Sequence, residues 1–400
     1  MVEAQTRWGL PMTTGSMIAG SGLAESDSPS RAAITATKKA IKWVPHAQRR
    51  LLIVFACGEC ATQPEVIVAA AEEVSGISNI IGCSGAGVLT NEGEIEGSGV
   101  AVLVIGATPV HTRCTDRFGS DPHHSTRTVF RDLDIEDHGS IISFFDAMSV
   151  HPDSMLDGLQ RLIPANTPII GGGAINDLNA PWVIDHSNPT TKTSNNTLSA
   201  TWLPDAQMQT ALSVGGRALG SPLPVTKAQG GVIVEIAGKR ALDILSQTVK
   251  QPMMSDLTRL SEGVFAGLPG PTGHLMLRPL IAIDPQMGAI AIGGSTIKSG
   301  DEIAFVLKDR DYIRHGLQSS LRELQAHQLA SPKFGLFIRG AGRGANLYGP
   351  TAGIETALVS SAFPMMPFAG FLSGCELAPA GRGGVIHLFS SILGIFTDRL

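Results

Sequence analysis

Short apolar runs, separated by small-residue loops and a proline, recur along the chain in one order. The first such segment begins with the apolar run at residues 51–55. It then passes Pro64 and the acidic residue behind it, and ends in the apolar run at 77–81 followed by Gly82. A short continuous apolar run is typical of a buried strand, and proline with an acidic residue after it is typical of a helix start. The pattern predicts strand, loop, helix, strand and a closing glycine.

Two further segments repeat this order, over residues 141–171 and 334–370, with Pro152 and Pro350 in the helix-start position. Strand–helix–strand units in series imply parallel strand pairs joined by helical crossovers. We therefore expect an α/β protein in which repeated strand–helix–strand units carry added antiparallel strands. We expect the units to form two pseudo-repeated halves packed around a cleft.

The segments between the units look antiparallel or irregular. The apolar runs at 280–283 and 289–292 flank a loop with proline and glycine, which predicts a hairpin. Asp309 or Asp311 is placed to cap the helix that follows. The polar stretch at 185–201 predicts a loop.

Composition narrows the class of protein. Glycine makes up 46 of 400 residues and charged residues only 16%, so tight turns are more prominent than charged surface helices. The net charge of −5 without a long basic run argues against nucleic acid and anionic membranes as partners. The first residues include Glu3 and lack an apolar core, which argues against a signal peptide. Five cysteines suit a reducing compartment, so we expect a cytoplasmic protein.

Several short segments, most of them rich in glycine, lie in an order that points to a family. They are residues 80–88, 169–174, 223–228, 334–344 and 370–379. Over roughly residues 45–395 the chain resembles the FIST family (F-box and intracellular signal transduction), with its N-terminal and C-terminal parts both present. The domains expected from this resemblance are an N-terminal segment with the first helix at 1–44, a FIST N-terminal domain at 45–224 and a FIST C-terminal domain at 225–400.

The resemblance implies a bacterial-type sensory module that binds a small ligand, amino acids for many members and haem for some. Such members work beside histidine kinases, cyclic-di-nucleotide enzymes or chemotaxis receptors. No transmitter domain is recognisable in the 400 residues. We therefore expect either a separate signalling partner or an activity of the protein's own.

Cys57 and Cys60 form a Cys-x-x-Cys pair between a predicted strand and a proline-started helix. A helix N-terminus at this place lowers the pKa of a thiol, so redox catalysis is one interpretation and a structural loop is the other. No second pair and no His-x-x-x-His motif accompanies them, so no metal site is expected.

Gly82, Cys83 and Ser84 open a near match to the Gly-x-Ser-x-Gly nucleophile elbow, but no helix is predicted after it. A tight turn, where bare backbone approaches a ligand or a neighbouring strand, is the preferred interpretation. Gly172, in the glycine run of the second unit, is expected to line the ligand in the same way. Cys83 is then a small buried residue, or a nucleophile if the protein is an enzyme.

The loop after the third predicted unit's first strand has the chemistry of an anion site. Arg339 and Arg343 stand among glycines whose backbone N–H groups are available, Gly344 follows, and a helix start lies beyond. Glu376 is a lone acid in a long apolar stretch. We predict that Arg343 and Glu376 clamp the two charged ends of an amino-acid-like ligand. An arginine paired with a surface acid is the alternative.

We expect no cofactor, and haem is the one considered. His387 lies in an apolar predicted strand and would be its ligand, although a lone histidine in a strand is more often a packed core residue.

The sequence thus predicts a protein that binds an amino-acid-like or other small carboxylate ligand and signals to a separate partner. The alternatives are a hydrolase or lyase with Cys83 or Cys375 as nucleophile and Glu376 as acid/base, and a haem-based gas sensor. Low charge and the apolar excess are compatible with a homodimer. The candidate ligand-binding residues are Gly82, Cys83, Ser84, Gly172, Arg339, Arg343, Gly344, Glu376 and His387.

Overall fold

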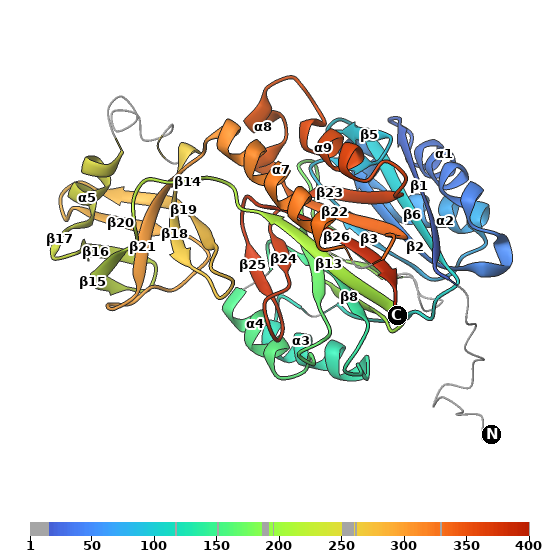
Figure 1. Cartoon of the computed structure of the whole chain (residues 1–400), viewed down its shortest axis with the longest axis horizontal. Helices are drawn as coiled ribbons and strands as arrows, with labels where there is room; N and C mark the ends of the chain where they lie inside the picture. Colours follow the sequence, from blue (N-terminus) through green and yellow to red (C-terminus); the bar gives the residue numbers. More distant parts are fainter. Residues whose placement is uncertain are drawn as a thin grey trace.

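The strands in the described part of the chain form three six-stranded sheets and a fourth sheet that closes into a barrel (Figure 1). Helices cover the outer faces of the three six-stranded sheets, and the predicted α/β class is confirmed. The structure, a computed structural model, describes residues 16–116, 118–149, 152–185, 192–194, 196–249, 260, 262–328 and 330–399.

All three six-stranded sheets share one strand plan, with two parallel strands in the middle, two antiparallel strands on one side and a hairpin on the other. The first sheet has the order β1 (Ile18–Glu25), β6 (Gly99–Gly106), β2 (Arg49–Cys57), β3 (Ile80–Ser84), β10 (Val183–Asp185), β11 (Lys192–Ser194). The second sheet has the order β7 (His111–Thr115), β12 (Leu198–Leu203), β8 (Ser140–Asp146), β9 (Ile169–Ala174), β24 (Glu376–Ala378), β25 (Val385–His387). The third sheet has the order β13 (Ala206–Ser213), β26 (Ser391–Asp398), β22 (Phe334–Gly340), β23 (Phe368–Ser373), β4 (Val88–Thr90), β5 (Gly93–Ile95).

The parallel pairs β2–β3, β8–β9 and β22–β23 are the three predicted strand–helix–strand units. A hairpin follows each unit but joins another unit's sheet. The pair β4–β5, after the first unit, completes the third sheet, β10–β11 completes the first, and β24–β25, after the third unit, completes the second. The sheets are therefore interlocked in a ring, and each depends on a hairpin from a different part of the chain.

The closing glycine of each unit has a steric reason. Gly82, Gly171 and Gly370 lie directly opposite a residue of the first strand in their parallel pair. A Cβ atom at these positions would come within 1.7–1.9 Å of that residue's carbonyl oxygen. Only glycine allows the two strands to approach this closely.

Apolar side chains from all three sheets fill the space where the sheets meet. Phe55 of β2 stacks on Phe371 of β23 with ring centroids 4.9 Å apart, and Phe144 of β8 meets both rings edge-on at 5.3 and 5.9 Å. Each sheet thus contributes one aromatic ring to the centre. Such contacts add specific geometry to the apolar burial that holds the sheets together.

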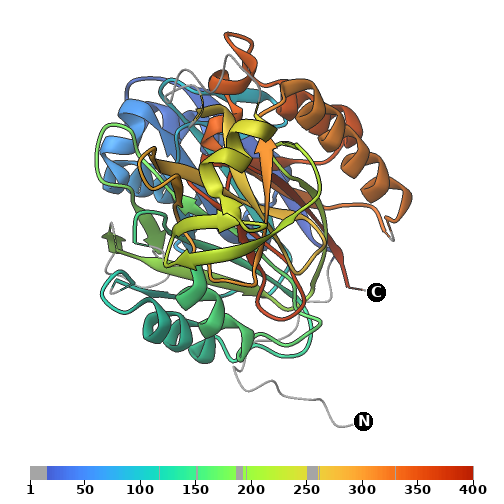
Figure 2. The ribbon, with the colours of Figure 1, turned by 90° about the vertical axis from the view of Figure 1, so that its left-hand side faces the viewer.

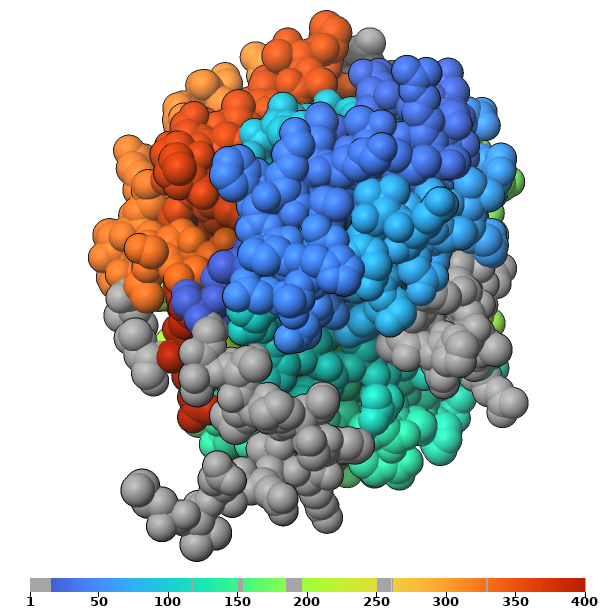
Figure 3. Space-filling view, turned by 90° about the vertical axis from the view of Figure 1, so that its right-hand side faces the viewer, coloured from blue at the N-terminus to red at the C-terminus, as the bar shows by residue number. Residues whose placement is uncertain are grey.

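A pair of helices packs on the outer face of each sheet, at three different sides of the molecule in Figure 2. Figure 3 looks onto the first pair, drawn in blue. The pairs are α1 (Pro29–Ala40) with α2 (Pro64–Ser75), α3 (Pro122–Asp132) with α4 (Pro152–Gln160), and α7 (Arg310–Ala326) with α9 (Ile354–Ala362). Shorter helical segments are η1 (Ile41–Trp43), η2 (His46–Gln48), η3 (Gly58–Thr62), η5 (Ala341–Arg343) and α8 (Ala345–Tyr348).

The barrel lies at one end of the molecule, on the left of Figure 1. Pairing of β18 with β21 closes it, and helix α5 (Ala241–Thr248) contributes to its separate apolar core. The expected boundary near Val225 lies within β15. The barrel strands are β14 (Arg217–Ala218), β15 (Leu223–Gln229), β16 (Val232–Ile236), β17 (Lys239–Arg240), β18 (Val264–Pro269), β19 (Leu275–Asp284), β20 (Ala289–Ile292) and β21 (Glu302–Leu307).

Local predictions had mixed outcomes. The β19–β20 hairpin is confirmed, and Asp309 caps α7 by accepting from the backbone N–H of Tyr312. Pro350 does not start a helix, because left-handed Gly353 precedes the first turn of α9. The predicted loop at 185–201 is wrong at Asp185, where β10 ends, over β11 (Lys192–Ser194), and from Leu198, where β12 begins. Residues 186–191 and 195 lie outside the described part of the chain. No described helix is long and apolar enough to cross a membrane.

Candidate functional site

Predicted site residues gather where the third sheet meets the hairpin β24–β25. Arg339 lies at the end of β22, Arg343 in η5, Glu376 at the start of β24 and His387 at the end of β25. Loops at the carboxyl ends of parallel strands are where α/β proteins place functional groups. All four side chains are buried, so each must find its hydrogen bonds inside the protein or in a ligand.

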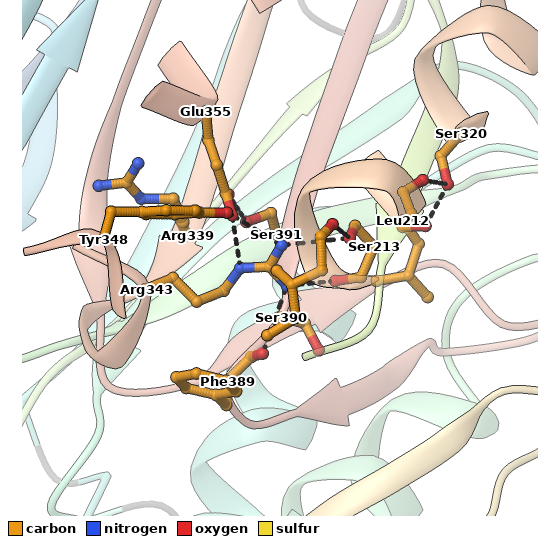
Figure 4. A network of polar contacts seen from close by, with 12 residues as sticks. Leu212, Ser213, Ser320, Arg339, Arg343, Tyr348, Glu355, Phe389, Ser390 and Ser391 are labelled. Carbon is orange, nitrogen blue, oxygen red and sulfur yellow. Dashed lines mark hydrogen bonds and ion pairs between the residues drawn. The ribbon is translucent and has the colours of Figure 1, made fainter. Parts of the chain in front are cut away.

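Arg343 has its hydrogen bonds within the chain (Figure 4). Its Nε and Nη2 donate to Oε1 of Glu355 at 3.0 and 2.8 Å, and Nη2 also donates to Oγ of Ser213. Nη1 donates to the carbonyl oxygens of Ser213 at 2.7 Å and Phe389 at 3.4 Å. These contacts account for all five N–H groups of a guanidinium. The arginine of the predicted clamp therefore has no spare donor for a ligand carboxylate in this structure.

Glu355 is the buried counter-ion of this arginine. Burial opposes its charge, but the guanidiniums of Arg343 and Arg339 outweigh burial and hold the pKa of this carboxyl below its ordinary value. The hydroxyl of Tyr348 donates to Oε1 at 2.7 Å, and the hydroxyl of Ser391 donates to Oε2. A carboxylate with this many partners is a fixed structural charge.

The predicted anion loop binds a carboxylate, and it is one of the protein's own. The backbone N–H of Ala345, directly after Gly344, donates to both carboxylate oxygens of Glu96 at 2.9–3.0 Å. Arg339 pairs with Glu94, which also accepts from the hydroxyl of Thr356. Both acids follow the first unit and arrive with the β4–β5 hairpin. This loop thus fastens the N-terminal part of the chain to the third sheet.

Glu376 is buried and carries a perturbed pKa. Its Oε1 accepts from the hydroxyl of Ser373 at 2.9 Å and its Oε2 from the backbone N–H of Ser390 at 2.8 Å. Burial raises the pKa of Glu376 to about 8, more than these hydrogen bonds lower it. At neutral pH the side chain is therefore a carboxylic acid that can gain a charge when a cation approaches.

His387 differs from Arg343 in its hydrogen bonding. It is 1% exposed, and neither ring nitrogen has a hydrogen-bond partner. Burial, with the positive charge of Arg278 nearby, lowers the pKa of His387 to about 4, so the ring is neutral at pH 7. A buried polar side chain without partners calls for a physical explanation, such as a bound water or ligand.

The barrel meets the core beside His387. Strand β19 contacts β25, and Phe265 of β18 stacks on Phe389 with ring centroids 5.2 Å apart. Arg278 of β19 is 3% exposed and donates from Nε to the hydroxyl of Ser295 at 2.6 Å. It faces Ala266 across the β18–β19 ladder, and the apolar core inside the barrel includes Ala266. Arg278 lies close enough to His387 for its charge to act on the ring, and we call the region between these two residues the junction site.

Gly172, Glu376 and His387 form a row across β9, β24 and β25, each directly opposite the next. Directly opposite residues on antiparallel strands share a face, so Glu376 and His387 present their side chains on one side of the sheet. A Cβ atom on Gly172 would lie about 3.0 Å from Ile338 and Phe371 of the third sheet. The missing side chain lets the third sheet pack closely against the face of the second sheet that carries this row.

The remaining predicted residues have structural contacts. Ser84 exchanges hydrogen bonds with the backbone of Trp182, and Gly82 and Cys83 lie within β3. Burial raises the pKa of the Cys83 and Cys375 thiols far above the range of a nucleophile. The expectation that either serves as a catalytic nucleophile therefore has the wrong electrostatics.

The Cys-x-x-Cys pair also lacks redox character. Cys57 lies at the end of β2 and Cys60 in η3, and burial raises the pKa of Cys57 to about 12 and that of Cys60 above its ordinary value. The Cys60 thiol donates to the carbonyl oxygen of Ser26 at 2.9 Å. All five cysteines of the chain are free thiols.

The site does not fit haem. His387 is enclosed between strands with 1% exposure, so no face of its ring is open to a porphyrin. Among the described residues no group of three or more metal-binding side chains is assembled. Two surface hollows, of about 250 and 430 Å³, lie elsewhere, and neither is lined by a predicted site residue.

Sequence reasoning missed Arg278, Glu94, Glu96 and Ser213. Arg278 could have been found, because it is a lone charge in an apolar run, the same signal that singled out Glu376. The other three arrive from distant parts of the chain through hairpin exchange and strand pairing. No local pattern shows such partners.

Comparison with known proteins agrees with the resemblance noted in the sequence. The FIST N domain model matches residues 50–239 and the FIST C domain model matches residues 241–379. An uncharacterized protein of Mycobacterium tuberculosis is 25% identical over 390 residues, covering 95% of this chain and 99% of the relative. An uncharacterized protein of Mycobacterium bovis is 25% identical over 206 residues, covering 50% of this chain and 53% of the relative.

Two solved structures also align with nearly the whole chain. A cyanuric acid hydrolase from A. caulinodans has a TM-score of 0.31 at 9% identity, covering 96% of this chain and 100% of that one. A chorismatase has a TM-score of 0.32 at 10% identity, covering 96% and 99%.

Proposed function

The chain belongs to the FIST family, and from that premise we propose that it is a sensory protein that binds a small ligand reversibly at the junction site. FIST domains are associated with sensory signal transduction. The observation that carries the proposal is the pair of buried, unpartnered ring nitrogens of His387. Leaving a buried polar group unpaired costs about 1–3 kcal/mol, and a ligand that pairs with it recovers this free energy.

The charges around His387 support a small carboxylate, such as an amino acid. At neutral pH the ring offers one N–H donor and one acceptor nitrogen. The donor and the positive charge of Arg278 suit a carboxylate, while Glu376, on the same face of the sheet, suits an ammonium group. The ligand clamp that we propose thus keeps Glu376 and replaces Arg343 by Arg278.

The position of the site offers a route for the signal. Arg278 belongs to the barrel, whereas His387 and Glu376 belong to the core. A ligand that touches both favours one arrangement of the barrel against the core, and this difference in affinity is what a sensor needs. We propose that a separate partner in the cytoplasm, such as a histidine kinase or a cyclic-di-nucleotide enzyme, reads that arrangement. Five free thiols support a reducing compartment.

Thermal unfolding with a panel of the twenty amino acids and small mono- and dicarboxylates tests this function. A ligand at a hundred times its Kd stabilises the folded state by about 2.7 kcal/mol, which raises the Tm by several degrees. We expect at least one compound to do so in the wild type, and its effect to vanish in His387→Leu and Arg278→Met. The matched control is Arg240→Met, an exposed barrel arginine that contacts only backbone carbonyls. No shift with any compound, or equal shifts in all variants, contradicts the proposal.

A further inference from the structure

In one segment of this protein, whose net charge is negative, every charged residue is basic. Between Asp27 and Glu59 the chain carries six of its 30 lysine and arginine residues and none of its 35 acidic residues. The rest of the chain therefore holds 24 basic against 35 acidic residues. A local positive field on a negatively charged molecule is a feature of surfaces that select an oppositely charged partner.

The fold gathers several of these charges in one stripe. Arg31, Lys38 and Lys42 stand at positions i, i+7 and i+11 of α1 and η1, so they share one side of the helix, with Thr35 between them. All four residues are exposed. The three cations make no hydrogen bond or ion pair within the described residues, whereas the neighbouring Lys39 is paired with Glu92 at 2.6 Å. Their charges are thus available to a partner.

An exposed tryptophan adjoins the stripe. Trp43 is 75% exposed, and within residues 16–62 it is the only large apolar side chain that is exposed. The turn that follows it is held by Arg49, which donates to the carbonyl oxygens of Val44 at 3.0 Å and Ser75 at 2.7 Å. Carbonyl partners fix the turn without neutralising the arginine. Tryptophan and arginine are the side chains enriched at the anchors of protein interfaces.

A hollow of about 250 Å³ opens along the same helix. Arg31, Thr35 and Lys39 line it from α1, and Leu23 and Glu25 line it from the end of β1. This volume accommodates one or two side chains of a partner. Figure 3 looks onto the face that carries α1 and the turn after it.

We propose that this face, formed by the stripe, Trp43 and the hollow, binds an acidic segment of a partner protein. Charge complementarity gives the partner its sign, Trp43 gives it an apolar contact, and the hollow, lined mainly by polar and charged residues, receives a polar side chain. A single exposed aromatic side chain beside a stripe of cations favours a protein over a lipid surface, which needs a broader apolar face. The proposal does not depend on the ligand at the junction site.

Fluorescence anisotropy with a labelled acidic peptide, four repeats of Glu-Glu-Leu, tests the proposal on the full-length chain. Because the whole molecule is negative, binding in 50 mM salt requires a local basic surface. We expect Kd to rise at least tenfold in Lys38→Glu/Lys42→Glu and about threefold in Trp43→Ala. Raising the salt to 300 mM weakens wild-type binding by a similar factor. Lys227→Glu/Lys239→Glu, two exposed lysines on the barrel, is the matched control and is expected to bind as the wild type does.

Three results would overturn the proposal. They are a wild-type Kd above 1 mM in low salt, an equal loss in the barrel control, and tighter binding to vesicles with 30% phosphatidylserine than to the peptide. The last result would assign the face to a membrane. A tenfold change corresponds to about 1.4 kcal/mol, which two interfacial charges supply.

Discussion

Arg343 and His387 are two buried polar residues of the same region with opposite hydrogen bonding. Arg343 is fully buried, and its five N–H groups are all matched by Glu355, Ser213 and Phe389. His387 is buried to nearly the same degree, and neither of its nitrogens is matched. The sequence placed both among the candidate ligand-binding residues. The structure distinguishes the two residues, because the protein supplies every hydrogen-bond partner of Arg343 and none for His387.

This difference distinguishes a charged residue that stabilises the fold from a polar residue that can still bind a ligand. A buried ion pair with every donor used stabilises one packing and has nothing left for a ligand. A buried neutral imidazole without partners destabilises the empty state and is relieved by a ligand that supplies them. Removing each residue should therefore have opposite consequences for stability and for binding.

Loss of the arginine should have the largest effect. Arg343→Met leaves the charge of Glu355 buried without its main partner, which costs about 3–5 kcal/mol of unfolding free energy. Urea unfolding measures this loss. Arg314→Met is the control, because this arginine is 41% exposed in a loose surface ion pair and its loss should cost about 1 kcal/mol or less. If the two variants lose the same amount of unfolding free energy, the hydrogen bonds between Arg343 and Glu355 do not stabilise the fold in this way.

Glu376 should give stability an unusual pH dependence. Burial raises its folded-state pKa from 4.5 to about 8, so between these values the folded protein holds a proton that the unfolded chain releases. Its contribution to stability is therefore fully present below pH 4.5 and is lost as the pH rises to about 8. One such proton gives a slope of up to about 1.4 kcal/mol per pH unit. Urea unfolding from pH 6 to 8 should show this slope in the wild type and a flatter profile in Glu376→Gln; equal slopes would contradict it.

His387→Leu should stabilise the protein by about 1 kcal/mol at pH 7, because it removes two unpaired nitrogens from an apolar setting. The advantage should grow in acid. The folded-state pKa of His387 is lowered from 6.5 to about 4, so the wild type loses stability as the pH falls through this range and the leucine variant does not. Thermal unfolding at pH 7 and pH 5 measures both effects. A destabilised variant at both pH values would mean that His387 has partners.

The buried thiols should make the smallest difference. Iodoacetamide at pH 8 should alkylate Cys83 and Cys375 about a hundredfold more slowly in the native protein than in urea, because burial disfavours the thiolate. Ligand binding should survive the treatment. Fast native alkylation at either residue, with loss of activity on any small amide, would instead support a thiol enzyme.

The sequence predicted the three strand–helix–strand units because their signals are local. Apolar runs, helix-start prolines such as Pro64 and Pro152 and a glycine such as Gly82 each act within a few residues. The helix start predicted at Pro350 was wrong, because the left-handed backbone at Gly353 delays the start of helix α9 to Ile354. The roles of the site residues depend instead on hairpin exchange, which brings Glu94 to Arg339 across more than two hundred residues.

Local sequence signals also identified some residues of the candidate site, but not their partners. The glycine-rich loop singled out Arg343 and the apolar surroundings singled out Glu376, but only the hydrogen-bond partners decide between a structural role and a ligand-binding role. Those partners are Ser213 of strand β13 for Arg343 and the backbone of Ser390, directly before strand β26, for Glu376. Arg278 is likewise a lone charge in an apolar run, that of β19. Its place beside His387 becomes evident only from the contact between β19 and β25.

The most direct test of the central claim observes the His387 ring nitrogens by NMR. Protein labelled with 15N-histidine is compared with and without the panel compound that gives the largest Tm shift, and the His387 signals are assigned by their absence in His387→Leu. We expect a neutral ring at pH 7 whose two nitrogen chemical shifts move on ligand addition, as hydrogen bonds form, while the shifts of the exposed His46 stay unchanged. Unchanged His387 signals at saturating ligand would contradict it.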